Sequence, residues 1–213
     1  MGESLTQSVF FIGLIIGIYF ISRKNIQIIG QSLLRILKNQ KITIFVLSML
    51  YFPGTFIHES AHMAFALLLA LRIHSIHLLP SFEENTVRLG SVVYERKDPF
   101  RGILIGIAPL VVGVFSLWLV QRYQLFPSQI VAQTVLFAYL IFTVSSTMFP
   151  SKRDLADGVY LIPLVVILFG VLYIFSMNLL ELFRVINSYL TVAFLINVGL
   201  FLSFGVVHLF TKR

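Results

Sequence analysis

The chain has 213 residues, of which 58% are hydrophobic and 12% charged, and it contains no cysteine. Soluble domains are about 45–50% apolar and about 25% charged, so this composition excludes an ordinary water-soluble domain and indicates an integral membrane protein. The lack of cysteine excludes disulfides, thiolate metal sites and cysteine nucleophiles. The formal net charge is +7, but the basic residues stand between apolar runs, where they serve as anchors at anionic lipid headgroups, so we expect the lipid bilayer and no nucleic acid as partner.

Apolar runs predict an all-α polytopic membrane protein with about six transmembrane helices, folded as a single domain over residues 1–213. Residues 26–38 carry apolar side chains at helical spacing with Arg35 and Lys38 opposite, which predicts a separate amphipathic helix at the membrane interface. The expected spans are residues 8–22, 42–71, 103–120, 130–149, 155–175 and 186–210.

A polar segment at residues 72–100 interrupts this pattern between the second and third spans. It holds four of the nine acidic residues of the chain, several β-branched residues and partial two-residue alternation. This pattern predicts a strand-bearing loop, with strands around 73–79 and 86–94 joined by a turn near 80–85.

The second span contains the segment PGTFIHESAHM at residues 53–63, with three ionisable side chains, His58, Glu59 and His62. Burying one such group in hydrocarbon costs several kcal/mol unless it is paired, hydrated or bound to something. Histidines four residues apart project from one helix face on successive turns, as two imidazoles must to bind one zinc ion at about 2.0–2.1 Å. Glu59 lies one position on, where it can take a proton from a metal-bound water as a general base. The alternative, a polar contact between packed membrane helices, must account for all three groups at once.

A catalytic zinc ion needs a third protein ligand and an open position for water. Counting spans places the turn at 150–153 on the same membrane side as the end of the histidine helix, so Asp154 and Asp157 can both approach His58 and His62. The two aspartates share a helix face, and geometry does not separate them. Ser151 and Asp154 also have the spacing of a helix cap, which gives Asp154 a structural role instead. The remaining candidates lie in the polar loop or at distant span ends, and we expect no ligand from them: His74, His77, His208 and Glu181.

In these features the chain resembles the site-2 protease family of intramembrane zinc metalloproteases. The matching segments are Pro-Gly ahead of HESAH, GIAP at residues 106–109 in the following span, and FPSKRDLADG at residues 149–158. The strand-bearing loop after the histidine helix also has the expected order, and the resemblance covers roughly residues 42–160, the expected catalytic core. It implies zinc ligands at His58 and His62, Glu59 as the general base, and an aspartate after Pro150 as the third ligand.

The third-ligand segment departs from the best-known members of that family, which have an asparagine three residues before the proline and Asp-Gly five after it. Here Thr147 stands at the first place, Asp154 is four after Pro150, and Asp157 is seven after it. A divergent branch uses Pro-Ser-x-x-Asp, which favours Asp154, whereas the Asp-Gly pair favours Asp157. We take Asp154 as the expected third ligand, with Asp157 as the alternative. The missing asparagine leaves the positioning of substrate to residues 145–147.

The sequence therefore predicts an intramembrane zinc metalloprotease that hydrolyses peptide bonds of membrane-spanning or membrane-adjacent proteins or peptides. An exposed strand edge within residues 73–94 is expected to hold the unwound substrate by β-augmentation. One alternative is a catalytically silent, metal-binding membrane scaffold, for which a disabled Glu59 would be expected. Another is a metal-ion transporter, a class that usually spreads its polar ligands over several spans.

Overall fold

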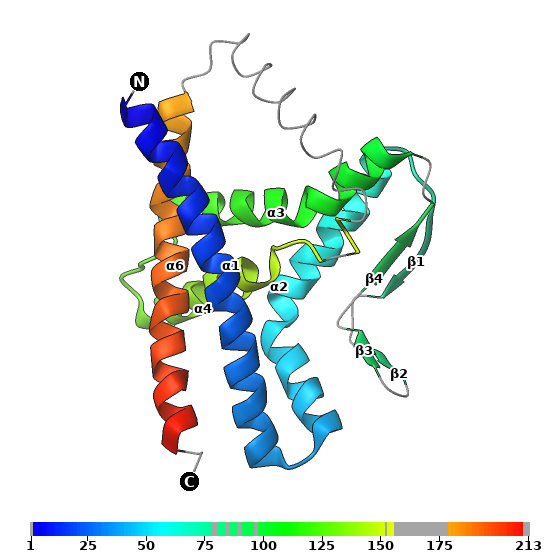
Figure 1. Cartoon of the computed structure of the whole chain (residues 1–213), viewed down its shortest axis with the longest axis vertical. Coiled ribbons are helices and arrows are strands. Elements are labelled where there is room, and N and C mark those ends of the chain that lie inside the picture. Colours follow the sequence, from blue (N-terminus) through cyan, green and yellow to red (C-terminus); the bar gives the residue numbers. More distant parts are fainter. Residues whose placement is uncertain are drawn as a thin grey trace.

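The computed structural model describes residues 2–77, 81–83, 86–88, 91–95, 98–151, 153–155 and 179–210 (Figure 1). Within these ranges the chain forms five helices: α1 (Gly2–Leu37), α2 (Gln40–Leu68), α3 (Pro99–Arg122), α4 (Val131–Thr147) and α6 (Leu179–Phe210). It also forms four short strands: β1 (Ile73–His77), β2 (Ser81–Glu83), β3 (Thr86–Arg88) and β4 (Ser91–Tyr94). The predicted helical membrane fold with a small strand-bearing loop is therefore observed in outline.

The prediction of six spans is not supported by the described residues, in which four helices, α1, α2, α3 and α6, are long and apolar enough to cross a membrane. The expected fourth span corresponds to α4, which has 17 residues and is shorter than the roughly 20 that a crossing usually needs. The expected fifth span, at 155–175, lies outside the described residues except for Leu155.

The separate interfacial helix expected at residues 26–38 is wrong, because α1 runs without a break from Gly2 to Leu37. Arg23 and Lys24 are themselves good helix formers, and no proline interrupts residues 2–37. At 1.5 Å per residue α1 is about 54 Å long, well beyond the hydrocarbon core of about 30 Å. Within the continuous helix, Ile29 is buried against Tyr51 of α2, and Ile26 and Leu33 pack against the same cluster.

The helices are arranged so that α2 contacts both α3 and α4. In Figure 1, α1 and α6 lie side by side and run in the same direction, α2 returns from the far end of α1, and α3 runs from the end of α2 across to α6. The main apolar core is formed by α1, α3, α4 and α6 and includes Leu14, Ile18, Leu117, Ile141 and Leu190. This packing places the first turns of α3 and the end of α4 beside the HESAH segment of α2.

The polar loop forms two antiparallel two-stranded sheets, β1 with β4 and β2 with β3. In the first sheet Ile73 lies opposite Tyr94 and His77 opposite Ser91. Strands are thus present where the sequence predicts them, but β2 forms within the expected turn and the expected second strand is divided into β3 and β4. Ile73 and Tyr94 pack against a buried cluster on α2 and α3, which anchors the first sheet beside the helices.

The outer surface of the helices is strongly apolar. Large exposed hydrophobic side chains occur on every described helix, and they include Leu5, Phe20, Leu68, Phe115, Val131 and Leu195. A water-soluble monomer rarely exposes contiguous apolar patches larger than a few hundred Å². This surface, together with four helices of membrane-crossing length, is consistent with an integral membrane protein.

Candidate metal centre

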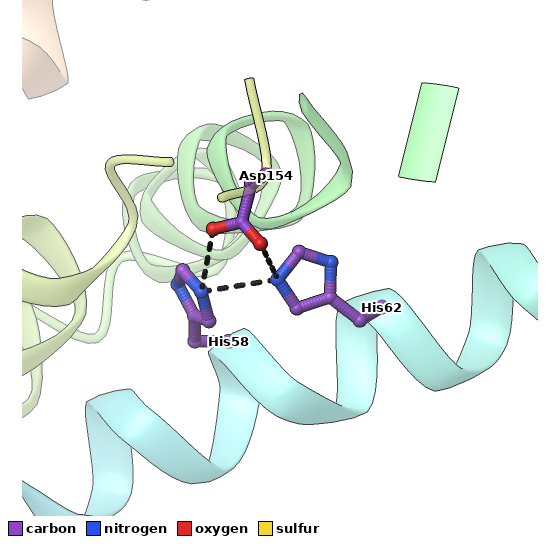
Figure 2. Close-up of side chains that lie close together, drawn as sticks. All are labelled: His58, His62 and Asp154. Carbon is purple, nitrogen blue, oxygen red and sulfur yellow. Dashed lines mark hydrogen bonds and ion pairs between the residues drawn. The ribbon is translucent and has the colours of Figure 1, made fainter. Parts of the chain in front are cut away.

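Three predicted ligands meet at the point where α2, α3 and the turn after α4 come together. His58 and His62 lie on successive turns of α2, and Asp154 lies in the short turn at 153–155. The two imidazole Nε2 atoms are 3.2 Å apart, the carboxylate Oδ1 is 3.6 Å from Nε2 of His62, and Oδ2 is 4.0 Å from Nε2 of His58. Figure 2 shows the carboxylate directed toward the gap between the two rings. The alternative ligand, Asp157, lies outside the described residues.

Each imidazole is held by a backbone carbonyl group on a different helix. Nδ1 of His58 is 2.7 Å from the Thr147 carbonyl oxygen, and Nδ1 of His62 is 2.9 Å from that of Ile105. A carbonyl oxygen only accepts hydrogen bonds, so in both rings Nδ1 carries the proton and donates it. Each Nε2 of a neutral ring then presents a lone pair to its neighbours. Metal-ligating histidines usually have this arrangement, in which the ring nitrogen that does not bind the metal donates to a backbone carbonyl or a carboxylate.

The site therefore brings together hydrogen-bond acceptors without a donor among them: two imidazole lone pairs and the carboxylate of Asp154. A proton shared between the two rings would stabilise one of these close contacts, whereas a cation between the ligand atoms stabilises all of them. The side chains of His58, His62 and Asp154 are 13%, 7% and 18% exposed, so the group is enclosed but has a surface that water can reach.

The carbonyl group that holds His62 is free because of a proline. In a regular helix the Ile105 carbonyl would accept from the backbone N–H four residues on, at position 109, and Pro109 has none. Pro109 lies inside α3, which nevertheless continues to Arg122. The proline of the GIAP segment thus leaves the Ile105 carbonyl free to orient His62. This role is not among those expected from the sequence.

The carbonyl group that holds His58 is free because α4 ends at Thr147. Pro150 follows shortly, and a proline disfavours helical conformation in the residue before it. The N–H of Ser151, which would be the helical partner of the Thr147 carbonyl, donates instead to Oδ2 of Asp154 at 2.7 Å, and the N–H of Asp154 lies 3.3 Å from the Ser151 hydroxyl. The reciprocal hydrogen bonds expected between Ser151 and Asp154 are therefore formed, and they leave the carboxylate directed toward the two imidazoles.

Two glycines let backbone segments approach this site closely. A side chain at Gly54 would collide with the Thr143 carbonyl of α4, and one at Gly106 would collide with the Asp154 carbonyl. Gly54 and Gly106 belong to the Pro-Gly and GIAP segments on which the family resemblance depends. Glycine at these two positions therefore has a structural role in this chain: Gly54 lets α4 approach α2, and Gly106 lets the Asp154 turn approach α3.

Glu59 follows His58 on α2 and is half-buried. Its carboxylate is not part of the group of candidate ligands formed by His58, His62 and Asp154. The role of Glu59 as a general base stays a prediction.

The residues expected to position substrate, 145–147, do not all face the metal ligands. Ser145 and Ser146 are buried and hydrogen-bonded to Asn197 of α6, so they face the interior of the helix bundle. Thr147 is half-buried, and its hydroxyl donates to the Thr143 carbonyl at 2.9 Å. Of the three, only Thr147 contacts a candidate ligand, and it does so through its backbone.

The candidates set aside in the sequence analysis lie elsewhere. His74 and His77 are exposed on β1, and Glu181 is exposed on α6. The side chain of His208 is outside the described part of the structure. None of the three described side chains belongs to the group formed by His58, His62 and Asp154.

Neither a scan against protein-family models nor searches of curated proteins and solved structures finds a match to this chain. The case for a metal site therefore depends on its geometry. Two imidazoles and one carboxylate are a donor set that zinc accepts, with bonds of about 2.0–2.2 Å. At a tetrahedral angle such bonds place ligand atoms about 3.3 Å apart, close to the 3.2–4.0 Å found between His58, His62 and Asp154.

Proposed function

We propose that this chain is a multi-pass integral membrane zinc metalloprotease, similar to the site-2 protease family, which hydrolyses peptide bonds of membrane-spanning or membrane-adjacent substrates. The observation that supports it best is the convergence of His58, His62 and Asp154 through acceptor atoms alone, within helices of membrane-crossing length. Intramembrane ionisable residues are costly and are generally retained for function.

In the proposed mechanism His58, His62 and Asp154 would hold the metal, and Glu59 would move the proton. Bound zinc would act as a Lewis acid and make water nucleophilic near neutral pH. Glu59 accepts a proton from the attacking water and then donates it to the amide nitrogen of the leaving segment. An intact glutamate beside His58 favours this proposal over a catalytically silent metal-binding scaffold, and the concentration of the ligands at one place favours it over an ion transporter.

Substrate would be held by the sheet of β1 and β4. A transmembrane helix hides its carbonyl groups in hydrogen bonds, so a substrate must unwind locally before a peptide bond can be attacked. A two-stranded sheet has open edges that can pair with an extended segment and replace the lost backbone bonds. The sheet is anchored through Ile73 and Tyr94 on a cluster that includes Ile105, the residue whose carbonyl holds His62. An added strand would therefore lie near the metal ligands.

The test combines metal analysis with cleavage of transmembrane peptides by the full chain reconstituted in lipid nanodiscs. We expect the wild-type protein to bind one zinc ion and to cleave a subset of such peptides. Glu59→Gln should keep zinc and lose cleavage, Asp154→Ala should lose both, and Glu181→Gln, a matched change on the exposed side of α6, should alter neither. Absence of zinc from the wild-type protein, or unchanged cleavage by Glu59→Gln, would refute the proposal.

A further inference from the structure

A buried polar cluster joins α1, α4 and α6 away from the metal ligands. At its centre Asn197 of α6 is fully buried. Its amide nitrogen donates to the Ser145 hydroxyl at 2.8 Å, and its amide oxygen accepts from the Ser146 hydroxyl at 3.2 Å. Asn25 of α1 donates to the Asn197 carbonyl oxygen at 3.0 Å.

The arrangement fixes the rotation of α4 about its axis. Ser145 and Ser146 are consecutive residues, and they bind opposite ends of one amide group, one as acceptor and the other as donor. An apolar side chain at position 197 would remove the acceptor of the Ser146 hydroxyl and the donor to the Ser145 hydroxyl, which would keep only its own bond to the Phe142 carbonyl at 3.2 Å. The cluster therefore ties the last turn of α4 to α6.

That last turn orients one of the candidate ligands. Thr147, the residue after Ser146, contributes the carbonyl group that accepts from Nδ1 of His58 at 2.7 Å. The other imidazole, His62, is held by Ile105 of α3, which the cluster does not touch. A change in the cluster should therefore reach His58 and leave His62 unaffected.

We propose that Asn197 is a positioning residue for the metal centre, which acts through Ser145 and Ser146 on the Thr147 carbonyl and so on the orientation of His58. The inference depends on the proposed metal site but not on peptide cleavage. Outer partners of metal-ligating histidines typically change metal affinity by about 10–100-fold when they are lost.

The chain offers a matched control in Asn187, which is also on α6 and is 3% exposed. Its amide donates to the backbone carbonyl and to the side chain of Gln7 on α1, both at 2.9 Å. Asn187 thus joins α6 to α1 as Asn197 does, through contacts that do not involve the end of α4. Asn187→Leu and Asn197→Leu remove the same chemical group from the same helix.

Two measurements on the full chain in detergent test the proposal. The first is zinc affinity, by competition with a chromophoric chelator. The second is the rate at which diethyl pyrocarbonate modifies His58 in the metal-free protein, followed by peptide mass spectrometry with His62 as the internal reference. We expect Asn197→Leu to lower zinc affinity about 10-fold and to raise the modification rate of His58 relative to His62, whereas Asn187→Leu leaves both quantities unchanged.

The proposal is overturned if Asn197→Leu leaves both quantities at the wild-type values, or if Asn187→Leu changes them equally, since the effect would then be general loosening of the bundle. If Asn197→Leu does not fold, Ser146→Ala removes one of the two bonds and should give a smaller change in the same direction; no change in Ser146→Ala would then also overturn it. A protein that binds zinc and responds as expected without cleaving peptides would support this inference and refute the protease function.

Discussion

The proline of α3 provides a sharp test of how the metal centre is built. Pro109→Ala supplies the missing backbone N–H at position 109, whose regular helical acceptor is the Ile105 carbonyl. That carbonyl now accepts from Nδ1 of His62 at 2.9 Å. In this variant the backbone N–H at position 109 competes with Nδ1 of His62 for the Ile105 carbonyl. Most substitutions near a site remove a contact, whereas this one adds a competing donor.

The expected effects on stability and on metal affinity have opposite signs. Proline is about 3 kcal/mol less favourable than alanine inside a helix. Pro109 is fully buried, and truncation of its ring to a methyl group costs about 0.8 kcal/mol per lost methylene group. Because the first effect is the larger, Pro109→Ala should leave the metal-free protein as stable as the wild type or more stable. A carbonyl oxygen has two lone pairs, so competition weakens the His62 bond without abolishing it. We therefore expect a loss of zinc affinity near 10-fold, the lower end of the usual range for outer partners, which corresponds to about 1.4 kcal/mol.

The assay is competitive zinc titration of detergent-solubilised protein, with thermal unfolding of the metal-free form measured alongside. Pro99→Ala is the matched control, because Pro99 is the first residue of α3, where a missing N–H has no helical acceptor to lose. Zinc affinity of Pro109→Ala equal to that of Pro99→Ala would refute the argument that the proline frees Ile105 for His62. A fall in affinity accompanied by a fall in metal-free stability would refute it as well, since damage to α3 would then explain the loss.

Three further predictions concern the same site. Gly106→Ala places a methyl group against the Asp154 carbonyl and should lower zinc affinity at least about 10-fold. Gly199 has open space around it, so Gly199→Ala should leave zinc affinity unchanged. Equal zinc affinities of the two variants would contradict the close approach of Asp154 to Gly106. Asp154→Asn removes a ligand and should lower zinc affinity by more than the roughly 100-fold seen for outer partners. Asp98 caps α3, and Asp98→Asn should leave zinc affinity unchanged. Zinc binding that survives in Asp154→Asn would exclude Asp154 as a ligand. Zinc at 100 times its Kd should raise the free energy of unfolding by about 2.7 kcal/mol. A melting temperature that is the same with zinc and with chelator would show that the folded protein binds no zinc.

The sequence predicts the histidine pair well because its signal is local. The four-residue spacing of His58 and His62 places both rings on one helix face wherever the helix lies. The third position is harder, because geometry along the chain treats Asp154 and Asp157 alike. The structure brings Asp154 to the histidines, through a turn whose hydrogen bonds to Ser151 were expected only as a structural alternative.

The outer partners of the histidines could not be predicted, since they are backbone atoms 43 and 89 residues away along the chain. A signal for one of them was nevertheless present. A proline within an apolar span frees the carbonyl four residues before it, and at Pro109 that carbonyl belongs to Ile105.

The errors in the predicted helices have a common cause: the ends of the apolar runs are not the ends of the helices. Arg23 and Lys24 interrupt an apolar run but not a helix, so α1 continues past them to Leu37. The α4 helix is apolar enough for a span, but it ends near Pro150 after 17 residues. Helix ends follow capping and proline positions, whereas hydropathy reports only the surroundings of the helix.

The order in which the parts of the metal centre occur along the chain has a consequence for its biosynthesis. The histidines of α2 are synthesised first, the acceptor at Ile105 follows, and the acceptor at Thr147 and the carboxylate of Asp154 come last. Until α3 and α4 dock, the imidazoles lack their backbone partners, and the motif that looks most reactive in the sequence has no complete ligand set. The proposed protease would therefore be inert while it is being inserted, and its activation would coincide with the packing of the last ligand-bearing turn against α3.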